Sequence, residues 1–371
     1  MPLDLTQHLI EIDTPALLVD LDRMEANLRR VASYAQAHSL RLRPHTKTHK
    51  SPLIARKQLA LGAAGLTVAK IGEAEVLVNA LADLLPIDLL IAFPIVGAAK
   101  LQRLAALARR TPITVALDSL ALARELSACA VANHVIVSVL VEFDAGLARV
   151  GVAPEQLLPL AIEVSRLPGL HLRGITFYPG HIKDAEAAGP QLEALRHLLA
   201  CQESCFRHAG VPLEIISGGS TPTLFHSHQL GPLNEIRPGT YVYEDLNTVE
   251  SGACTLADCA ASVLATVVSV RPGHIIIDGG SKTFSSDRPA GARASTFGRV
   301  VEAPGCAFHK MNEEHGFIDT TASERQFAVG DRLRIIPNHV CVAMNLHERV
   351  HGVRGCEVET VWNVDGRGKL Q

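Results

Sequence analysis

The chain has 371 residues, of which 47% are hydrophobic and 20% charged, so it holds enough apolar material for a sizeable folded core. Its 38 acidic and 35 basic residues give a formal net charge of −3, which argues against a nucleic-acid binder, because phosphate contacts need a surplus of basic residues. The apolar runs are far shorter than the roughly 18–20 residues that span a bilayer, so no membrane partner is expected.

Short apolar runs rich in β-branched residues alternate with longer stretches of helical period. A strand is predicted at Ala16–Asp20, and a helix follows over 23–37, with Asp22 as its candidate cap. Eight further strands are predicted at 40–44, 66–69, 89–93, 113–117, 134–142, 172–177, 213–217 and 234–237. Amphipathic helices are predicted between most of them, for example at 99–110, 120–130, 154–167 and 191–208.

This alternation predicts an α/β fold, a parallel (β/α)8 barrel of the TIM type over residues 22–247. An open, doubly wound sheet is the alternative, which eight strands with helices between them fit less well. From about Thr248 onward, strand-like runs at 261–270, 274–278, 332–336 and 356–364 have no helices between them. We therefore expect residues 248–371 to form a mainly antiparallel β domain, which also takes in residues 1–21 because the barrel already has its eight strands.

Two further features predict a cytoplasmic protein. The first ten residues contain Asp4 and no basic segment, so they do not resemble a signal peptide. The eight cysteines are scattered and form no Cys-x-x-Cys motif. We expect a reducing compartment in which most cysteines are small core residues.

The densest group of chemically active residues is the run Arg41–Lys50, at the end of the first barrel strand. On a strand, Arg43, His45 and Lys47 share one face, and barrel enzymes place their catalytic residues at this end of the strands. If Lys47 were buried beside these cations, its pKa would fall, and only a neutral amine attacks a carbonyl to form a Schiff base. The alternative is a solvated basic turn.

Four loops at the same end of the barrel are candidate binding loops. Paired glycines and hydroxyl residues follow the seventh strand at 218–221, and Arg237–Tyr241 follows the eighth, where barrels commonly bind phosphate. Arg149, after the fifth strand, is either a residue of the barrel mouth or half of a surface ion pair. Tyr178, after the sixth strand, either packs on a flat ligand or sits at the edge of the core. Ordinary turns remain the alternative for the glycine loop.

The predicted β domain carries a His-x-Cys motif, His339 and Cys341, after an apolar strand. Alternation along a strand would put both side chains on one side, and imidazole with thiolate suits Zn²⁺. Two residues fill only part of a tetrahedral site, so water or substrate would complete it. A buried cysteine beside a structural histidine is the alternative.

The chain resembles the D-threonine aldolase / D-serine dehydratase family, which belongs to the alanine-racemase-like (fold-type III) pyridoxal-phosphate enzymes. The resemblance rests on the opening segment 13–20 and on the runs 43–50, 144–151, 218–221, 237–243, 277–282, 314–316 and 339–341, in the order that the family has them. It implies pyridoxal 5'-phosphate as cofactor, a small D-amino acid as substrate and a homodimer.

By this resemblance Lys47 is the catalytic lysine that holds the cofactor. The other expected cofactor-binding residues are His45, Arg149, Tyr178, Gly218, Gly219, Ser220, Thr221 and Tyr241.

By the same resemblance His339 and Cys341 are the metal ligands. Aldolase-like members of the family tend to carry His-x-Asp and to use Mn²⁺, whereas dehydratase-like members carry His-x-Cys and use Zn²⁺. Because His339 and Cys341 make the second pattern, the resemblance favours Zn²⁺, with Mn²⁺ or Mg²⁺ as alternatives.

The implied activity is that of a lyase acting on D-3-hydroxy-amino acids. The cofactor is an electron sink, Lys47 removes the Cα proton, and the metal binds the 3-hydroxyl as it leaves, so that a 2-oxo acid and ammonia form. The first alternative is retro-aldol cleavage to glycine and an aldehyde. A racemase and a non-catalytic cofactor carrier are further alternatives, and the metal pair and the β domain argue against both.

Overall fold

The computed structural model describes residues 11–184, 189–288 and 296–371. The opening ten residues, on which the expectation of no signal peptide rests, lie outside this part. The described chain divides into two compact units. The barrel unit comprises 31–47, 51–239 and 369–371, and the β unit comprises the described residues up to Arg30, Thr48–Lys50 and Thr240–Gly368. Within the described ranges, no helix combines the length and the apolar character needed to cross a membrane.

The barrel unit contains an eight-stranded parallel sheet in the order β2-β9-β8-β7-β6-β5-β4-β3. A bridge between His45 and Thr67 joins its two outer strands and closes the barrel. The strands are β2 (Arg41–Leu42), β3 (Leu66–Val68), β4 (Leu89–Ile91), β5 (Ile113–Leu117), β6 (Val137–Glu142), β7 (Leu170–Thr176), β8 (Ile215–Gly218) and β9 (Glu235–Ile236). This confirms the predicted barrel and its eight strands.

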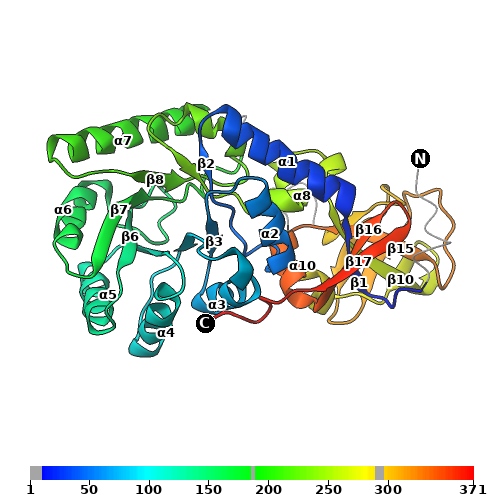
Figure 1. The fold of residues 1–371 in the computed structure, drawn as a ribbon. Helices are drawn as coiled ribbons and strands as arrows, with labels where there is room; N and C mark the ends of the chain where they lie inside the picture. The colour runs from blue at the N-terminus through cyan, green and yellow to red at the C-terminus, as the bar shows by residue number, and fades with distance from the viewer. Residues whose placement is uncertain (1–10, 185–188, 289–295) are drawn as a thin grey trace. The chain divides into compact units, whose positions relative to one another are not determined.

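Helices alternate with these strands because their apolar residues recur at helical spacing. They are α1 (Leu21–Ala37), α2 (Pro52–Ala60), α3 (Ile71–Ala80), η1 (Ala82–Leu84), α4 (Ala98–Ala108), α5 (Leu120–Ala132), α6 (Pro154–Ser165), α7 (Gly189–His208) and η2 (Leu224–Gln229). Figure 1 shows α4 to α7 on the outer side of the strands. The predicted cap of α1 is wrong: the helix begins at Leu21, and the Asp20 side chain accepts the amide of Arg23 at 3.0 Å.

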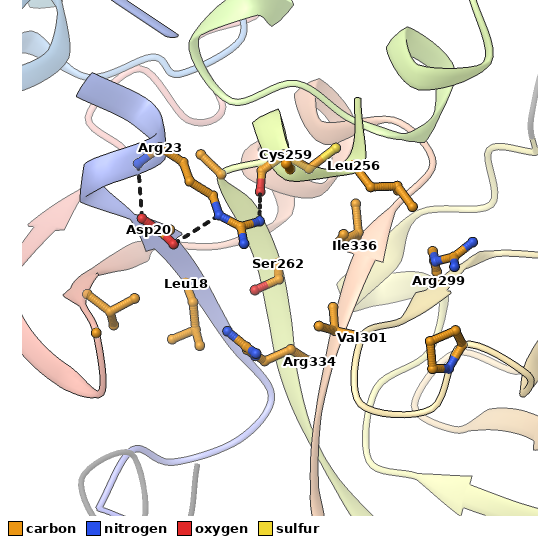
Figure 2. A pocket seen from close by; sticks show the side chains of 15 residues that line it. Leu18, Asp20, Arg23, Leu256, Cys259, Ser262, Arg299, Val301, Arg334 and Ile336 are labelled. Carbon is orange, nitrogen blue, oxygen red and sulfur yellow. Dashed lines mark hydrogen bonds and ion pairs between the residues drawn. The ribbon is translucent and has the colours of Figure 1, made fainter. Parts of the chain in front are cut away.

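The β unit contains a nine-stranded sheet with the path β13-β14-β11-β10-β1-β16-β17, and β15 pairs with both β10 and β12. Its strands are β1 (Ala16–Asp20), β10 (Ala261–Arg271), β11 (His274–Ile277), β12 (Gly298–Val300), β13 (Ala307–Met311), β14 (Gly316–Asp319), β15 (Arg332–Pro337), β16 (Arg349–Arg354) and β17 (Glu357–Asn363). As predicted, β1 joins this sheet: it pairs antiparallel with β10 and parallel with β16. One face of the sheet carries a cavity (Figure 2).

Short helices interrupt the β unit, so the prediction that helices are absent there is wrong. They are η3 (Thr240–Val242), α8 (Leu246–Glu250), η4 (Leu256–Asp258), α9 (Ser281–Phe284) and α10 (Val340–Leu346). Each is too short to show a helical period in the sequence. Side chains set their boundaries instead: Asp245 accepts the amide of Thr248 at 2.9 Å and begins α8.

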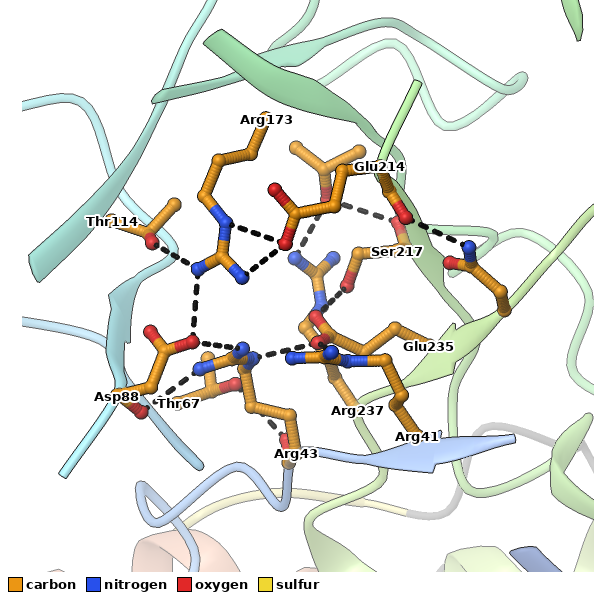
Figure 3. A network of polar contacts seen from close by, with 12 residues as sticks. Arg41, Arg43, Thr67, Asp88, Thr114, Arg173, Glu214, Ser217, Glu235 and Arg237 are labelled. Carbon is orange, nitrogen blue, oxygen red and sulfur yellow. Dashed lines mark hydrogen bonds and ion pairs between the residues drawn. The ribbon is translucent and has the colours of Figure 1, made fainter. Parts of the chain in front are cut away.

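The barrel interior holds charged residues where barrels usually hold branched apolar ones (Figure 3). Arg43 is 1% exposed and Glu235 is fully buried, and Arg43 Nε lies 2.9 Å from a Glu235 carboxylate oxygen. Arg43 also donates to the Asp88 carboxylate at 2.9 Å, and Arg173 donates to the same carboxylate at 2.9 Å. Although burial raises the pKa of Asp88, the hydrogen bonds and charges of Arg43 and Arg173 together outweigh it and hold the pKa below its ordinary value.

This network makes a sharp stability prediction. Arg43→Ala should lower the free energy of unfolding by about 3–5 kcal/mol, because it leaves the buried Glu235 carboxylate without its main partner. Arg41 is the matched control: it approaches the same carboxylate at 3.4 Å, but its side chain is 40% exposed. Arg41→Ala should cost about 0–1 kcal/mol. Urea unfolding of both variants measures the difference, and equal losses would contradict a buried network.

Candidate active site

Lys47 lies in a turn rather than on a strand. β2 ends at Leu42, and the turn is held by the amide of His45 on Pro238 O at 2.9 Å and the amide of Thr46 on Thr67 O at 2.8 Å. The Lys47 side chain is exposed, so the burial that would favour the neutral form of this amine is not present in this structure. The buried lysine is Lys50, which is 8% exposed and donates to Gly366 O at 3.4 Å.

The expected common face of Arg43, His45 and Lys47 is also wrong. Because the regular strand stops at Leu42, strand alternation does not continue to Lys47. Arg43 turns into the barrel network described above, whereas the Nδ1 atom of His45 accepts the Lys47 amide at 3.4 Å. The His45 ring therefore contacts the Lys47 backbone, and the Arg43 side chain belongs to the core of the barrel.

Tyr178 brings Lys47 and Arg149 to one place in the barrel unit. The Lys47 Nζ atom lies 6.0 Å from the centre of the Tyr178 ring, and the Arg149 guanidinium carbon lies 4.8 Å from it. The loop that carries Arg149 is held by Asp144, whose carboxylate accepts the amides of Gly146, Leu147 and Ala148 at 2.9 to 3.1 Å. These hydrogen bonds lower the pKa of Asp144. The Lys47 and Arg149 side chains thus both lie near one aromatic ring.

The glycine loop after β8 is shaped to accept a group from outside. Gly219 has a φ of +90°, which favours glycine, and a Cβ at Gly218 would collide with the Phe177 ring. Gly219, Ser220 and Thr221 are buried, and the Ser220 amide and hydroxyl both contact the Thr223 hydroxyl, at 3.3 and 3.1 Å. The amides of Gly219 and Thr221 have no acceptor within the described ranges. Buried amides normally have one, so this loop is suited to an anion.

The remaining candidates lie around this loop and in the β unit. The amide of Arg237 donates to Gly218 O at 3.1 Å, and its guanidinium donates to the Thr176 hydroxyl at 2.6 Å, inside the barrel. Tyr241, by contrast, belongs to η3 of the β unit and is 1% exposed. The glycine loop and Arg237 therefore lie in contact within the barrel unit, whereas Tyr241 belongs to the β unit.

Two residues that the sequence patterns leave without a role stand at the ends of neighbouring strands. Glu142, the last residue of β6, is 6% exposed, and burial raises its pKa against the opposing charges of Arg237 and Arg149. His181 follows β7 and packs over Gly146, and its buried Nδ1 atom has no hydrogen-bond partner in the described chain. In the sequence, Glu142 stands out as a carboxylate within an otherwise apolar strand. His181 is marked only by its position directly after Tyr178-Pro179-Gly180.

The His339–Cys341 pair lies where β15 gives way to α10. His339 is the residue before the helix, and Cys341 is in its first turn, so the expected strand alternation is wrong. The helix begins there because Asp245 accepts the Val340 amide at 3.0 Å. The two side chains still meet: a hydrogen bond to Cys341 raises the pKa of His339 to about 9. The Cys341 sulfur also lies 3.2 Å from the Thr48 hydroxyl.

Asp287 orients the imidazole of this pair. Its carboxylate lies 3.0 Å from His339 Nδ1, and its backbone carbonyl accepts the Asn338 side chain at 3.0 Å. A histidine held at Nδ1 by a carboxylate has its Nε2 atom left for a metal ion, which is the usual arrangement around zinc. Among the described residues no third His, Cys, Asp or Glu completes a metal cluster with this pair. A metal held here would therefore keep open positions.

Asp287→Asn should weaken zinc binding about 10- to 100-fold, because the amide no longer fixes the imidazole as a carboxylate does. The affinity is measured by competition with a fluorescent chelator. Asp365→Asn is the control, since Asp365 is exposed and has no side-chain partner in the part of the chain that the structure describes. Equal affinities of the two variants would show that Asp287 does not act on the pair.

Two family descriptions match the chain. Residues 19–247, more than half of its length, match the alanine racemase N-terminal domain. The chain belongs to the alanine racemase N-terminal domain family. Residues 260–353 match a second description, that of a putative serine dehydratase domain.

The relatives of this protein include enzymes named as aldolases and enzymes named as dehydratases. A D-threonine aldolase of Arthrobacter sp. is 34% identical over 97% of this chain and 94% of its own. A D-threo-3-hydroxyaspartate dehydratase of Delftia sp. (strain HT23) is 34% identical over 90% of this chain and 92% of its own. Both names denote lyases, which agrees with the expected enzyme class.

The solved structures that resemble this chain also include both an aldolase and a dehydratase. The crystal structure of D-threonine aldolase from Filomicrobium marinum has a TM-score of 0.90 and 32% identity, covering 98% of this chain and 97% of that one. A D-threo-3-hydroxyaspartate dehydratase variant in the metal-free form has a TM-score of 0.87 and 31% identity, covering 96% and 98%. The predicted resemblance and the predicted alanine-racemase-like fold are confirmed, and the names leave the reaction open between cleavage and dehydration.

Proposed function

We propose that this family member is a pyridoxal-phosphate- and metal-dependent lyase that releases ammonia from D-3-hydroxy-amino acids. The observation that carries the proposal is the His339 imidazole, held by Asp287 and in contact with the Cys341 thiol. A thiolate ligand favours Zn²⁺ over the harder ions Mn²⁺ and Mg²⁺. By the resemblance, a cysteine at this position goes with dehydration rather than with aldol cleavage.

The barrel unit offers suitable residues for the cofactor. The exposed Lys47 amine is available for covalent attachment, and the unused amides of Gly219 and Thr221 are suited to the phosphate. Arg149 would donate to the oxygen on the cofactor ring, and the Tyr178 ring, which lies near both Arg149 and Lys47, offers an aromatic surface for it. When bound, pyridoxal 5'-phosphate supplies an electron sink for negative charge at the substrate Cα atom.

The chain's own groups would then divide the work as follows. Lys47, once its amine is neutral and no longer attached, takes the proton from the substrate Cα atom. His339 and Cys341 would hold the divalent ion, and the ion would supply Lewis acidity toward the substrate 3-hydroxyl, which is otherwise a poor leaving group. Overall, a D-3-hydroxy-amino acid is converted into a 2-oxo acid and ammonia, and the water lost from the substrate is returned when the enamine product hydrolyses.

One assay decides between the two lyase reactions. The zinc- and cofactor-loaded protein is incubated with D-serine, D-threonine and D-threo-3-hydroxyaspartate, and ammonia and aldehyde are measured in parallel. We expect ammonia and the 2-oxo acid in equal amounts. If aldehyde and glycine form without ammonia, the dehydratase proposal is wrong and the protein is an aldolase. The 34% identity to a D-threonine aldolase supports this second candidate function.

A further inference from the structure

The cavity in Figure 2 contains none of the residues considered for catalysis. Its volume is about 320 Å³, which is in the range of small-molecule sites. All of its lining residues belong to the β unit. They come from β1, the start of α1, β10, β12, β15 and β16, from the turns after β12 and β16, and from the segment around η4. The cavity therefore shares no residue with the lyase site proposed above.

The floor of the cavity is an apolar strip of the sheet. Leu18 is 1% exposed and lies opposite Ser262, and Ile336 is 6% exposed and lies opposite Arg299. Residues that face each other across antiparallel strands point to the same side of the sheet. The strip therefore has a polar side chain beside each apolar one, and these polar side chains rise from the floor.

One end of the cavity gathers hydrogen-bond donors that the protein leaves unused. In Figure 2 the Ser262 hydroxyl lies between the side chains of Arg23 and Arg334. Arg23 is engaged by Asp20 at 3.2 Å and by Cys259 O at 3.1 Å, and Arg334 uses only its Nε atom, on Glu302 at 2.8 Å. Within the ranges described, the Ser262 hydroxyl and both terminal nitrogens of Arg334 make no hydrogen bond.

The opposite wall carries a third guanidinium group. The Arg299 side chain is exposed and has neither an ion pair nor a hydrogen bond with any described residue. Figure 2 shows it across the apolar side chains of Val301 and Ile336 from Arg334. The cavity thus has donors at both ends and an apolar stretch between them.

We propose that this cavity binds a small dicarboxylate. One carboxylate would lie between Arg23, Ser262 and Arg334, because the two unused terminal nitrogens of Arg334 can donate two parallel hydrogen bonds to it. The second carboxylate would pair with Arg299, and the methylene chain would lie on the apolar floor. A monocarboxylate would use only the first end, and a neutral diamide would find no charge complement at either.

Calorimetric titration of the full-length protein tests this with glutarate, butyrate and glutaramide. We expect glutarate to bind and glutaramide not to bind. Arg299→Ala should weaken glutarate binding about 10- to 100-fold, the effect of a lost hydrogen bond to a charged group, and leave butyrate binding unchanged. Arg271→Ala is the matched control, since Arg271 is exposed at the end of β10 and has no side-chain partner among the described residues.

Two further measurements show whether glutarate binds in this cavity. Lys47→Ala should bind glutarate as tightly as the unaltered protein; loss of binding would place the dicarboxylate in the active site and overturn the proposal. The Arg299→Ala variant should have the same molecular mass in solution, and so the same oligomeric state, as the unaltered protein. A changed oligomeric state would show that this face is a contact between copies of the chain, and would overturn the proposal. No glutarate binding at millimolar concentration, or equal effects of the Arg299 and Arg271 variants, would also overturn it.

Discussion

Lys47→Ala should reduce ammonia release by about 10⁴-fold, because it removes both the amine that would hold the cofactor and the base for the Cα proton. Lys47→Arg should be equally inactive, since a guanidinium stays protonated and forms no Schiff base. Borohydride reduction followed by peptide mapping should place the pyridoxyl group on Lys47 in the unaltered protein. This second readout does not depend on activity.

Lys70→Ala is the control for the lysine prediction. Lys70 also follows a barrel strand, β3, but its Nζ atom lies over the Phe93 ring at 3.4 Å from the ring centre. Its loss should leave the labelled peptide unchanged. Label on Lys50, the buried lysine three residues further along the chain, would show that the assignment to Lys47 is wrong.

Removal of the metal should have the second largest effect. Exhaustive chelation, or His339→Ala, should lower ammonia release about 10³-fold, since Lewis-acid assistance to a hydroxyl leaving group contributes several kcal/mol. Added Zn²⁺ should restore the chelated protein but not the variant. Metal content is measured by mass spectrometry alongside the activity. The cofactor should stay bound throughout, because Lys47 needs no metal to hold it.

A substitution of Cys341 tests which metal ion the site with His339 prefers. Cys341→Asp should weaken Zn²⁺ and favour a harder ion, because the soft thiolate is replaced by a carboxylate. Cys201→Ser is the control, since Cys201 is exposed and lies in α7 of the barrel unit. If the unaltered protein keeps full activity after chelation, or releases aldehyde with Mn²⁺ and no ammonia, the dehydratase function is wrong.

The barrel could be predicted because its strands are short and apolar with turn residues between them. β5 runs from Ile113 to Leu117, as the sequence predicts, and the predicted bounds of α5 and α7 differ by at most two residues from those observed. The glycine loop after β8 is predicted for the same reason, since it directly follows such a run. The local pattern of apolar and polar residues is sufficient to predict a helix or strand whose conformation is determined by its own residues.

The errors lie where contacts distant in sequence decide the geometry. Asp287 holds His339 from 52 residues away, and Asp245 begins α10 from 95 residues away, so no spacing rule reports either. Arg43 turns inward because the fold places Glu235 beside it. Lys47 is exposed because the strand ends at Leu42, before the alternation can reach it. Side-chain direction at a strand end is set by such partners, which the sequence does not identify.

The charged interior of the barrel has a consequence for how this protein can change over generations. Arg43, Asp88, Arg173 and Glu235 share their partners, so the effect of replacing one depends on which of the others are present. A neutral residue at one position is harmful alone and becomes tolerable only after its partner has also changed. Such epistasis makes the order of substitutions matter. Descendants are therefore expected to keep the whole set or to replace it as a group.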